Sequence, residues 1–136
     1  IQKANTGGEY NRSEGISLWS RTGPDRFQAV YGRGKDNDDG GHRILSYEVT
    51  DLTKWYHVAA TIDGSDVKLY IDGVLEATDT QLDTVTPNTG TNGPTIGRRN
   101  GGGTHDGQIS NVQLYTKALS ASEILQNYNA LKSRFI

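Results

Sequence analysis

The sequence predicts an all-β fold, an antiparallel β-sandwich of two sheets with one short α-helix near the C-terminal end. Three observations predict it: short apolar runs that alternate with period two, frequent turn signals built on glycine, and a change to helical periodicity only after residue 120. A single sheet would leave one apolar face in water, so the strands are expected to bury that face between two layers. A length of 136 residues fits one domain, residues 1–136.

Three strands are expected in the N-terminal third of the chain. A turn at 22–25 and a polar, glycine-rich loop at 32–41 separate them. The expected strands are residues 16–19, 27–31 and 44–49. In the third strand, Leu45, Tyr47 and Val49 fall on one face, which is the pattern of a half-buried strand.

The middle of the chain predicts a meander of three antiparallel strands. The first strand, 55–62, presents alternate residues to one face, namely Tyr56, Val58, Ala60 and Ile62. The second alternates in the same way through Val67, Leu69 and Ile71. The pair Asp72-Gly73 then indicates a type I′ hairpin, because both central positions of that turn need positive φ. Residues 74–78 form the returning strand.

Two further strands and a helix complete the expected elements. The strands are residues 95–98 and 108–115, and a long polar loop at 80–94 precedes them. Ile109 and Val112 have opposite parity, which indicates a bulge or a strand buried on both faces. The helix spans 120–132, because Ser120 and Glu123 have the spacing of a capping box. Its apolar stripe consists of Ile124, Leu125, Tyr128 and Leu131.

Two stretches of the sequence carry a family signature. The first runs from Trp55 to Gly73, and the second comprises residues 95–97, 107–115 and 118–124. Together they resemble the laminin-G-like domains of the concanavalin A-like lectin/glucanase superfamily, which implies a jelly-roll sandwich. The resemblance also implies several strands ahead of Ile1, and we expect the rest of a longer parent polypeptide, or a partner, to supply them.

Composition excludes several classes of function. The chain has no cysteine, so disulfides, thiolate-bound zinc and cysteine nucleophiles are excluded. A net charge of −2 argues against a nucleic-acid binder. No apolar run is long enough to cross a bilayer, so we expect no membrane insertion.

We expect a non-catalytic chain. The resemblance implies that enzymes of the superfamily carry a Glu-x-Asp-x-x-Glu strand, whereas none of the glutamates here has that pattern. The glutamates are Glu9, Glu14, Glu48, Glu76 and Glu123. We interpret His57 as a hydrogen-bonded residue beside the core.

An acidic loop is a candidate calcium site. Asp36, Asp38 and Asp39 offer the oxygen ligands that a hard cation prefers, although no glutamate follows at EF-hand spacing. The alternative is a solvated acidic turn. The resemblance implies an acidic calcium ligand in the closing strand, where this chain has Ser110-Asn111 instead.

Aromatic and planar polar side chains are candidate sugar ligands. A sugar generally stacks on an aromatic face while polar groups bind its hydroxyls. The aromatic candidates are Trp19, Tyr31 and Tyr47, and the polar candidates are Arg33, Arg98, Arg99 and Asn100. For each aromatic the alternative is packing inside the sandwich, which is also our interpretation of Trp55.

The function expected from these features is that of a binding or adhesion module in a larger extracellular protein. The resemblance implies carbohydrate or glycoconjugate as the ligand. A homo-oligomer is one expected form of assembly. One alternative is a structural decoration, tail or appendage domain on a virion or microbial surface. Another is an accessory domain of a polysaccharide-degrading enzyme.

Overall fold

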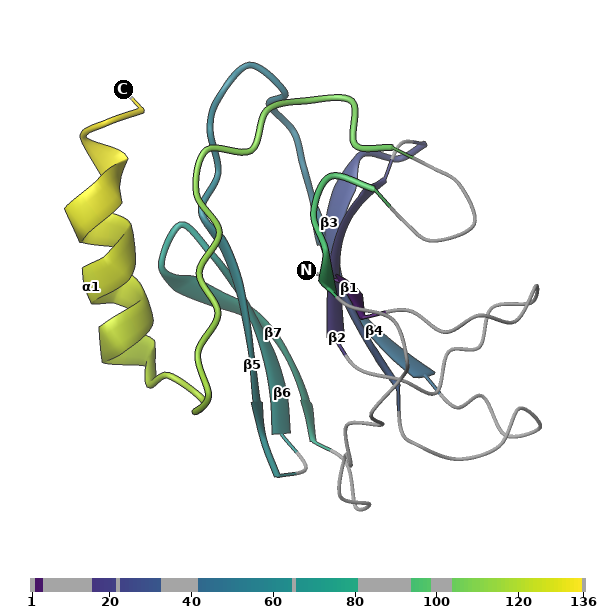
Figure 1. Ribbon diagram of the computed structural model, residues 1–136, viewed down its shortest axis with the longest axis vertical. Coiled ribbons are helices and arrows are strands. Elements are labelled where there is room, and N and C mark those ends of the chain that lie inside the picture. The colour runs from purple at the N-terminus through teal and green to yellow at the C-terminus, as the bar shows by residue number, and fades with distance from the viewer. Residues whose placement is uncertain are drawn as a thin grey trace.

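The computed structural model of the protein describes residues 2–3, 16–21, 23–32, 42–64, 66–80, 94–98 and 104–135. Over these ranges, two antiparallel three-stranded sheets lie one against the other, with a two-stranded sheet beside them and one helix outside (Figure 1). The strands are β1 Gln2–Lys3, β2 Ile16–Arg21, β3 Arg26–Gly32, β4 His42–Glu48, β5 Val58–Asp63, β6 Asp66–Ile71, β7 Val74–Thr80 and β8 Pro94–Thr95, and the helix is α1 Ala121–Lys132. The predicted antiparallel sandwich with one C-terminal helix is confirmed.

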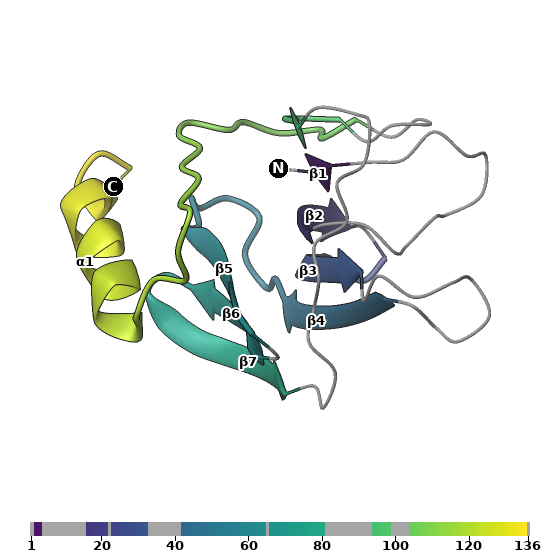
Figure 2. The same cartoon turned by 60° about the horizontal axis from the view of Figure 1, so that its bottom comes forward.

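The core lies between the β2-β3-β4 sheet and the β5-β6-β7 sheet, whose facing surfaces are seen in Figure 2. The first sheet contributes Ala29, Tyr31 and Leu45, and the second contributes Val67, Leu69 and Ile71. Partly buried side chains pack around this cluster, among them the expected Tyr56, Val58, Ala60 and Ile62. The period-two alternation therefore identified the inward faces of β4, β5 and β6.

A hydrogen bond joins the two sheets inside this core. The side chain of Tyr31 on β3 is fully buried, and its hydroxyl donates to Oδ2 of Asp79 on β7 at 2.7 Å. The bond gives the hydroxyl of Tyr31 a polar partner at the edge of an apolar cluster. The expectation that Tyr31 offers a face to a sugar is wrong, because the core and this bond enclose its ring.

The predicted meander is confirmed, including its turn. Strands β5, β6 and β7 pair in sequence order. Between β6 and β7, Asp72 has a φ of 51° and Gly73 a φ of 82°, so both central positions of the hairpin are left-handed. A register shift between Leu69 and Tyr70 interrupts the β6–β7 pairing.

The helix α1 covers part of the outer face of the β5-β6-β7 sheet. Tyr70 points outward from β6 and is buried with Leu119 and Ile124, while Ala59 packs beside them. The predicted apolar stripe is only partly correct, because the side chain of Leu125 remains 44% exposed. Within the described ranges, no helix has the length and apolar character that crossing a bilayer requires.

The segment 108–115 differs from its prediction, because it is not a strand. Four of its apolar side chains are exposed, namely Ile109, Val112, Leu114 and Tyr115. Among the residues that the structure describes, no backbone hydrogen bond pairs this segment with a neighbouring strand. A segment with strand-like alternation forms a β-strand only when its backbone hydrogen-bonds to a neighbouring strand. The described residues provide no such neighbour here.

Two smaller expectations also differ. Trp55 was assigned to the core but is 39% exposed, and its ring lies 5.0 Å from the ring of Phe135, beyond the end of α1. The strand expected at 95–98 is reduced to β8, which pairs with β1, and to an isolated bridge between Arg98 and Thr104.

We expect Gly73→Ala to lower the free energy of unfolding by about 2–5 kcal/mol, the sum of left-handed strain and overpacking. A Cβ on Gly73 would lie 2.9 Å from Cδ1 of Leu125 and 3.3 Å from its Cα, so the helix would have to shift. Gly64→Ala is the matched control, because Gly64 has a φ of +57° but no atom within 4 Å. It should lose about 1–2 kcal/mol. Urea denaturation measures both variants, and equal losses would contradict the helix contact.

Candidate functional site

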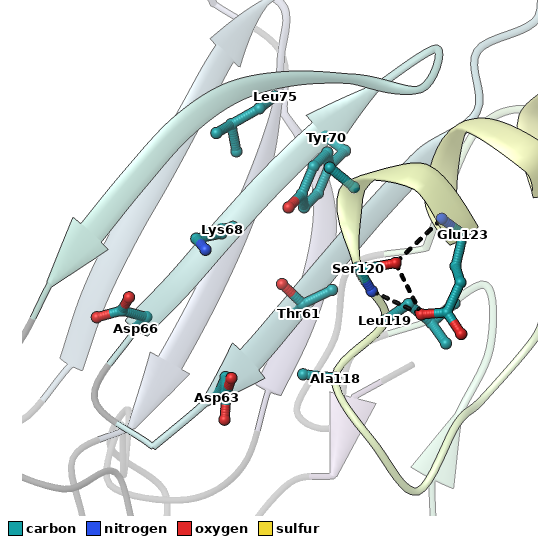
Figure 3. A pocket seen from close by; sticks show the side chains of 11 residues that line it. Thr61, Asp63, Asp66, Lys68, Tyr70, Leu75, Ala118, Leu119, Ser120 and Glu123 are labelled. Carbon is teal, nitrogen blue, oxygen red and sulfur yellow. Dashed lines mark hydrogen bonds between the residues drawn. The ribbon is translucent and has the colours of Figure 1, made fainter.

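A groove of about 440 Å³ opens between the outer face of the β5-β6-β7 sheet and the N-terminal end of α1 (Figure 3). On the sheet side it is lined by Thr61, Asp63, Asp66, Lys68, Tyr70 and Leu75. Residues 118–121 and Glu123 form the opposite wall. The size suits a small ligand, since binding pockets generally span about 300–1,000 Å³.

The polar lining follows from strand alternation. Successive side chains of a strand point to opposite faces, so residues next to core positions point outward. Leu69 faces the core while its neighbours Lys68 and Tyr70 face the groove. In the same way, Ala60 and Ile62 pack inward while Thr61, between them, faces the groove. The groove is thus the polar side of strands whose other side is apolar.

Two hydroxyl groups form the floor of the groove. Tyr70 is 3% exposed and Thr61 is 8% exposed. Neither hydroxyl makes a hydrogen bond in the part of the chain that the structure describes. Figure 3 shows both oxygens turned into the groove. Neither oxygen is one of the enclosed polar atoms of the described residues, so a water molecule or a ligand in the groove can bind both hydroxyls.

Charged side chains stand around this floor. Asp63 follows Thr61 along β5 and is exposed, whereas Asp66 and Lys68 are half-buried on β6. In Figure 3 the ammonium of Lys68 lies on the same side of the sheet as the carboxylate of Asp66. Two carboxylates and one ammonium therefore line the sheet side of the groove.

The helix wall is fixed by the predicted capping box. The backbone N–H of Glu123 donates to Oγ of Ser120 at 3.3 Å, and the backbone N–H of Ser120 donates to Oε2 of Glu123 at 2.8 Å. The ammonium of Lys117 lies 2.6 Å from Oε1 of Glu123. The Lys117 bond, followed by those from Ser120, lowers the pKa of Glu123 to about 2. The carboxylate of Glu123 therefore stabilises the helix cap and is not counted as a ligand-binding group.

His57 lies where the Asp72-Gly73 hairpin meets α1. Its backbone N–H donates to Oδ1 of Asp72 at 2.8 Å, and the N–H of Asp72 donates back to the His57 carbonyl at 2.8 Å. The imidazole lies 6.0 Å from the ring of Tyr128, and its Nδ1 is enclosed with no hydrogen-bond partner among the residues that the structure describes. His57 is therefore hydrogen-bonded, as predicted, but through its backbone rather than through Nδ1 of its ring. Burial lowers the pKa of His57, against the opposing charge of Asp72.

The aromatic residues proposed for sugar stacking are not brought together. Tyr31 and Tyr47 face the sandwich interior, where Tyr47 packs beside the core cluster. Trp19 pairs with Gln28, and the neighbouring pair Leu18–Ala29 faces the core, so Trp19 points to the opposite face of the sheet.

The remaining predicted site residues lie away from the groove or outside the described residues. Arg98 is exposed, and its carbonyl accepts a hydrogen bond from Oγ1 of Thr95 at 3.0 Å. Arg33, Arg99 and Asn100 lie outside the described residues, as do the calcium candidates Asp36, Asp38 and Asp39. Within the described ranges, no three His, Asp or Glu side chains gather as a metal site.

Sequence reasoning missed the groove although its signal was present. The alternation that placed Leu69 in the core also placed Lys68 and Tyr70 on the other face. What the pattern could not supply is the position of α1, which turns an outer sheet face into a groove.

Three comparisons with known proteins bear on this arrangement. The family model described as the concanavalin A-like lectin/glucanases superfamily, a laminin G family, matches residues 3–125. No curated protein matches the chain. An S-layer domain-containing protein from Clostridium thermocellum, solved by crystallography, is similar in structure with a TM-score of 0.50 and 19% sequence identity, over 94% of this chain and 69% of that one.

We expect Ser120→Ala to lower the free energy of unfolding by about 1 kcal/mol, because the substitution removes the acceptor for the first turn of α1. Ser122→Ala is the matched control, since among the described residues the Ser122 hydroxyl bonds only to the hydroxyl of Ser120, at 3.0 Å. It should change stability by less than about 0.5 kcal/mol. Chemical denaturation followed by circular dichroism measures both, and a neutral Ser120→Ala would contradict the cap.

We expect His57 to make stability depend on pH. Its folded-state pKa is lowered from the ordinary 6.5, so the unfolded chain binds the proton more tightly. The contribution is fully present above pH 6.5 and is lost as the pH falls through the lowered folded-state pKa. His57→Asn should flatten the pH dependence of unfolding in that window. An NMR titration in which the His57 ring titrates at or above 6.5 would contradict the effect of burial.

Proposed function

The chain belongs to the concanavalin A-like lectin/glucanases superfamily, and from this premise we propose that it is a non-catalytic binding module with carbohydrate as its ligand. Fold membership alone does not define a ligand, so the proposal depends on the chemistry of the groove. Two sheets that share one core supply a rigid support, and the groove lies on the outer face of one of them.

The observation that carries the proposal is the pair of unpartnered hydroxyls on the groove floor. Thr61 and Tyr70 can each donate and accept a hydrogen bond, as sugar hydroxyls also can. The carboxylate of Asp63 and the ammonium of Lys68 add an acceptor and a donor nearby. Such a set of short polar contacts within a small concave surface suits a ligand that carries several hydroxyls.

The positions of the glutamates support a non-catalytic role. The resemblance implies that the enzymes of the superfamily carry both glutamates on one strand, in a Glu-x-Asp-x-x-Glu motif. Glu48 lies on β4, Glu76 on β7 and Glu123 in α1, so no two of these three share a strand. Glu123 is also held in the helix cap, where it pairs with Lys117.

We place this module in an extracellular, virion or cell-surface protein. The support is an analogy with the S-layer domain-containing protein, which has the same general fold. The proposal includes a calcium ion at Asp36, Asp38 and Asp39, since three carboxylates in one loop suit that cation.

A second candidate function is structural assembly, and segment 108–115 favours it. The segment has the sequence pattern of a strand, exposes Leu114 to 74%, and makes no ladder with the residues that the structure describes. An exposed strand-like segment is a template for pairing with another chain. In this candidate, a β-strand from the parent polypeptide or from a partner pairs with 108–115 and covers Leu114.

A glycan array with and without EDTA tests the two candidates. Carbohydrate binding predicts saturable binding to a defined set of glycans, because the groove presents a fixed set of hydrogen-bonding groups; loss in EDTA would support the calcium ion. Ordered oligomers that form without glycan, measured by light scattering, would support assembly instead. Turnover of a polysaccharide in a reducing-sugar assay would contradict the non-catalytic proposal.

A further inference from the structure

We infer that protonation of His57 releases α1 from the outer face of the β5-β6-β7 sheet while the core between the two sheets stays closed. His57 lies at the hairpin on which the helix rests, and the start of that helix is one wall of the groove. Acid would therefore open the groove without unfolding the domain. The inference names the element that leaves, and it does not depend on which ligand the groove binds.

The attachment of α1 to the sheet is small. Of the twelve residues of α1, only Ile124 is buried. It packs with Leu119 and Tyr70 in a cluster that shares no residue with the core between the two sheets. The helix can therefore leave without opening that core. A helix of this length is marginal in water by itself, so a released α1 would also lose its helical structure.

Farther along, α1 rests on the Asp72-Gly73 hairpin, beside His57. A Cβ on Gly73 would lie 2.9 Å from Cδ1 of Leu125 and 3.2 Å from Cδ1 of Tyr128, so the helix closely approaches the turn. The ring of Tyr128 also lies 6.0 Å from the imidazole. Two backbone hydrogen bonds hold His57 to Asp72, which fixes the imidazole at this junction. The imidazole is therefore part of the surface on which the helix docks.

This surface suits a neutral imidazole and not a charged one. Nδ1 of His57 is enclosed and bonds to no described residue, whereas Nε2 is not among the enclosed atoms. The neutral ring can thus keep its one proton on Nε2. The imidazolium carries a proton on both nitrogens, so one N–H would be enclosed without an acceptor. Because an unpaired buried charge is unfavourable, the proton favours the state in which the helix has left and water reaches the ring.

The charges around the imidazole do not offset this cost. Of the carboxylates in the described ranges, Asp72 acts on the ring, but burial has the larger effect and lowers the pKa of His57. Oδ1 of Asp72 accepts from the backbone N–H of His57, and Oδ2 lies 3.6 Å from the ammonium of Lys54. On the helix, the ammonium of Lys132 lies 5.4 Å from the centre of the Tyr128 ring. Both ammonium groups would repel an imidazolium at this junction.

The cap at the start of α1 does not titrate in the same range. The bond from Lys117 and those from Ser120 lower the pKa of Glu123 to about 2. Its carboxylate therefore stays ionised while His57 takes up a proton, below pH 6.5. A loss of α1 in that window would be due to His57 and not to the cap.

Amide hydrogen exchange of the whole chain, followed by mass spectrometry, tests the inference. Exchange is measured about one pH unit above 6.5 and about two units below it, and each rate is normalised to that of the matching synthetic peptide. In acid, the protection of α1 should fall by at least about threefold, because the proton binds more tightly to the released state. At both pH values, β6 should stay at least about tenfold better protected than α1. Equal protection of α1 and β6 would show that the helix opens only with the whole domain, and unchanged protection of α1 in acid would show no release; either result overturns the inference.

A pair of histidine variants tests which group takes up the proton. Asparagine does not ionise, so His57→Asn should abolish the loss of α1 protection in acid. His105→Asn is the matched control, because Nδ1 of His105 bonds to Oγ of Ser20 on β2, away from the helix. The acid-induced loss should persist in that control. A loss that persists in His57→Asn, or that disappears in His105→Asn, would contradict the role of His57.

An NMR titration of the unaltered protein decides the matter if His57→Asn does not fold. The ring signals of His57 and the amide signals of α1 should change with one common midpoint below 6.5, and two different midpoints would overturn the inference. No glycan is needed for any of these measurements. A protein that binds no glycan would therefore contradict the proposed function alone, and a helix that stays docked in acid would contradict this inference alone.

Discussion

Strand β6 carries large apolar or aromatic side chains on both faces, and the rest of the structure depends on burying them. Val67, Leu69 and Ile71 bury one face against the β2-β3-β4 sheet, and Tyr70 buries the other beneath α1. Each fully buried side chain of this size contributes about 1.5–3 kcal/mol. Two layers must therefore enclose β6, namely a second sheet on the inside and the helix on the outside.

The groove exists because α1 covers only part of the outer face of β6. Ser120 caps α1 at a position where the helix covers Tyr70, and the outward residues farther along β6 are Lys68 and Asp66. These polar side chains do not need the helix above them. The capping box at the start of the helix thus forms one wall of the groove. The carboxylate of Glu123 stabilises that wall through its bonds to the backbone of Ser120 and to Lys117.

Two predictions from the sequence, the sugar-stacking aromatics and the strand at 108–115, differ from the structure for different physical reasons. Trp19, Tyr31 and Tyr47 are separated because residues of one sheet point to opposite faces and because Tyr31 is needed to bond Asp79 across the core. The strand at 108–115 failed because a ladder requires a neighbour, and none lies beside it among the described residues. The local sequence indicated both features. Whether the aromatic rings were exposed, and whether 108–115 paired as a strand, depended on residues far away in the sequence.

The sequence by itself determined the elements that local chemistry controls. Alternation set the inward faces of β5 and β6, the Asp72-Gly73 pair set the turn, and Ser120 with Glu123 set the start of α1. Only the tertiary structure decided that α1 lies on the outer face of the second sheet, and therefore that Thr61 and Tyr70 share a groove. Period and capping act over a few residues, whereas the docking of a helix on a sheet depends on which apolar surfaces the whole fold leaves uncovered.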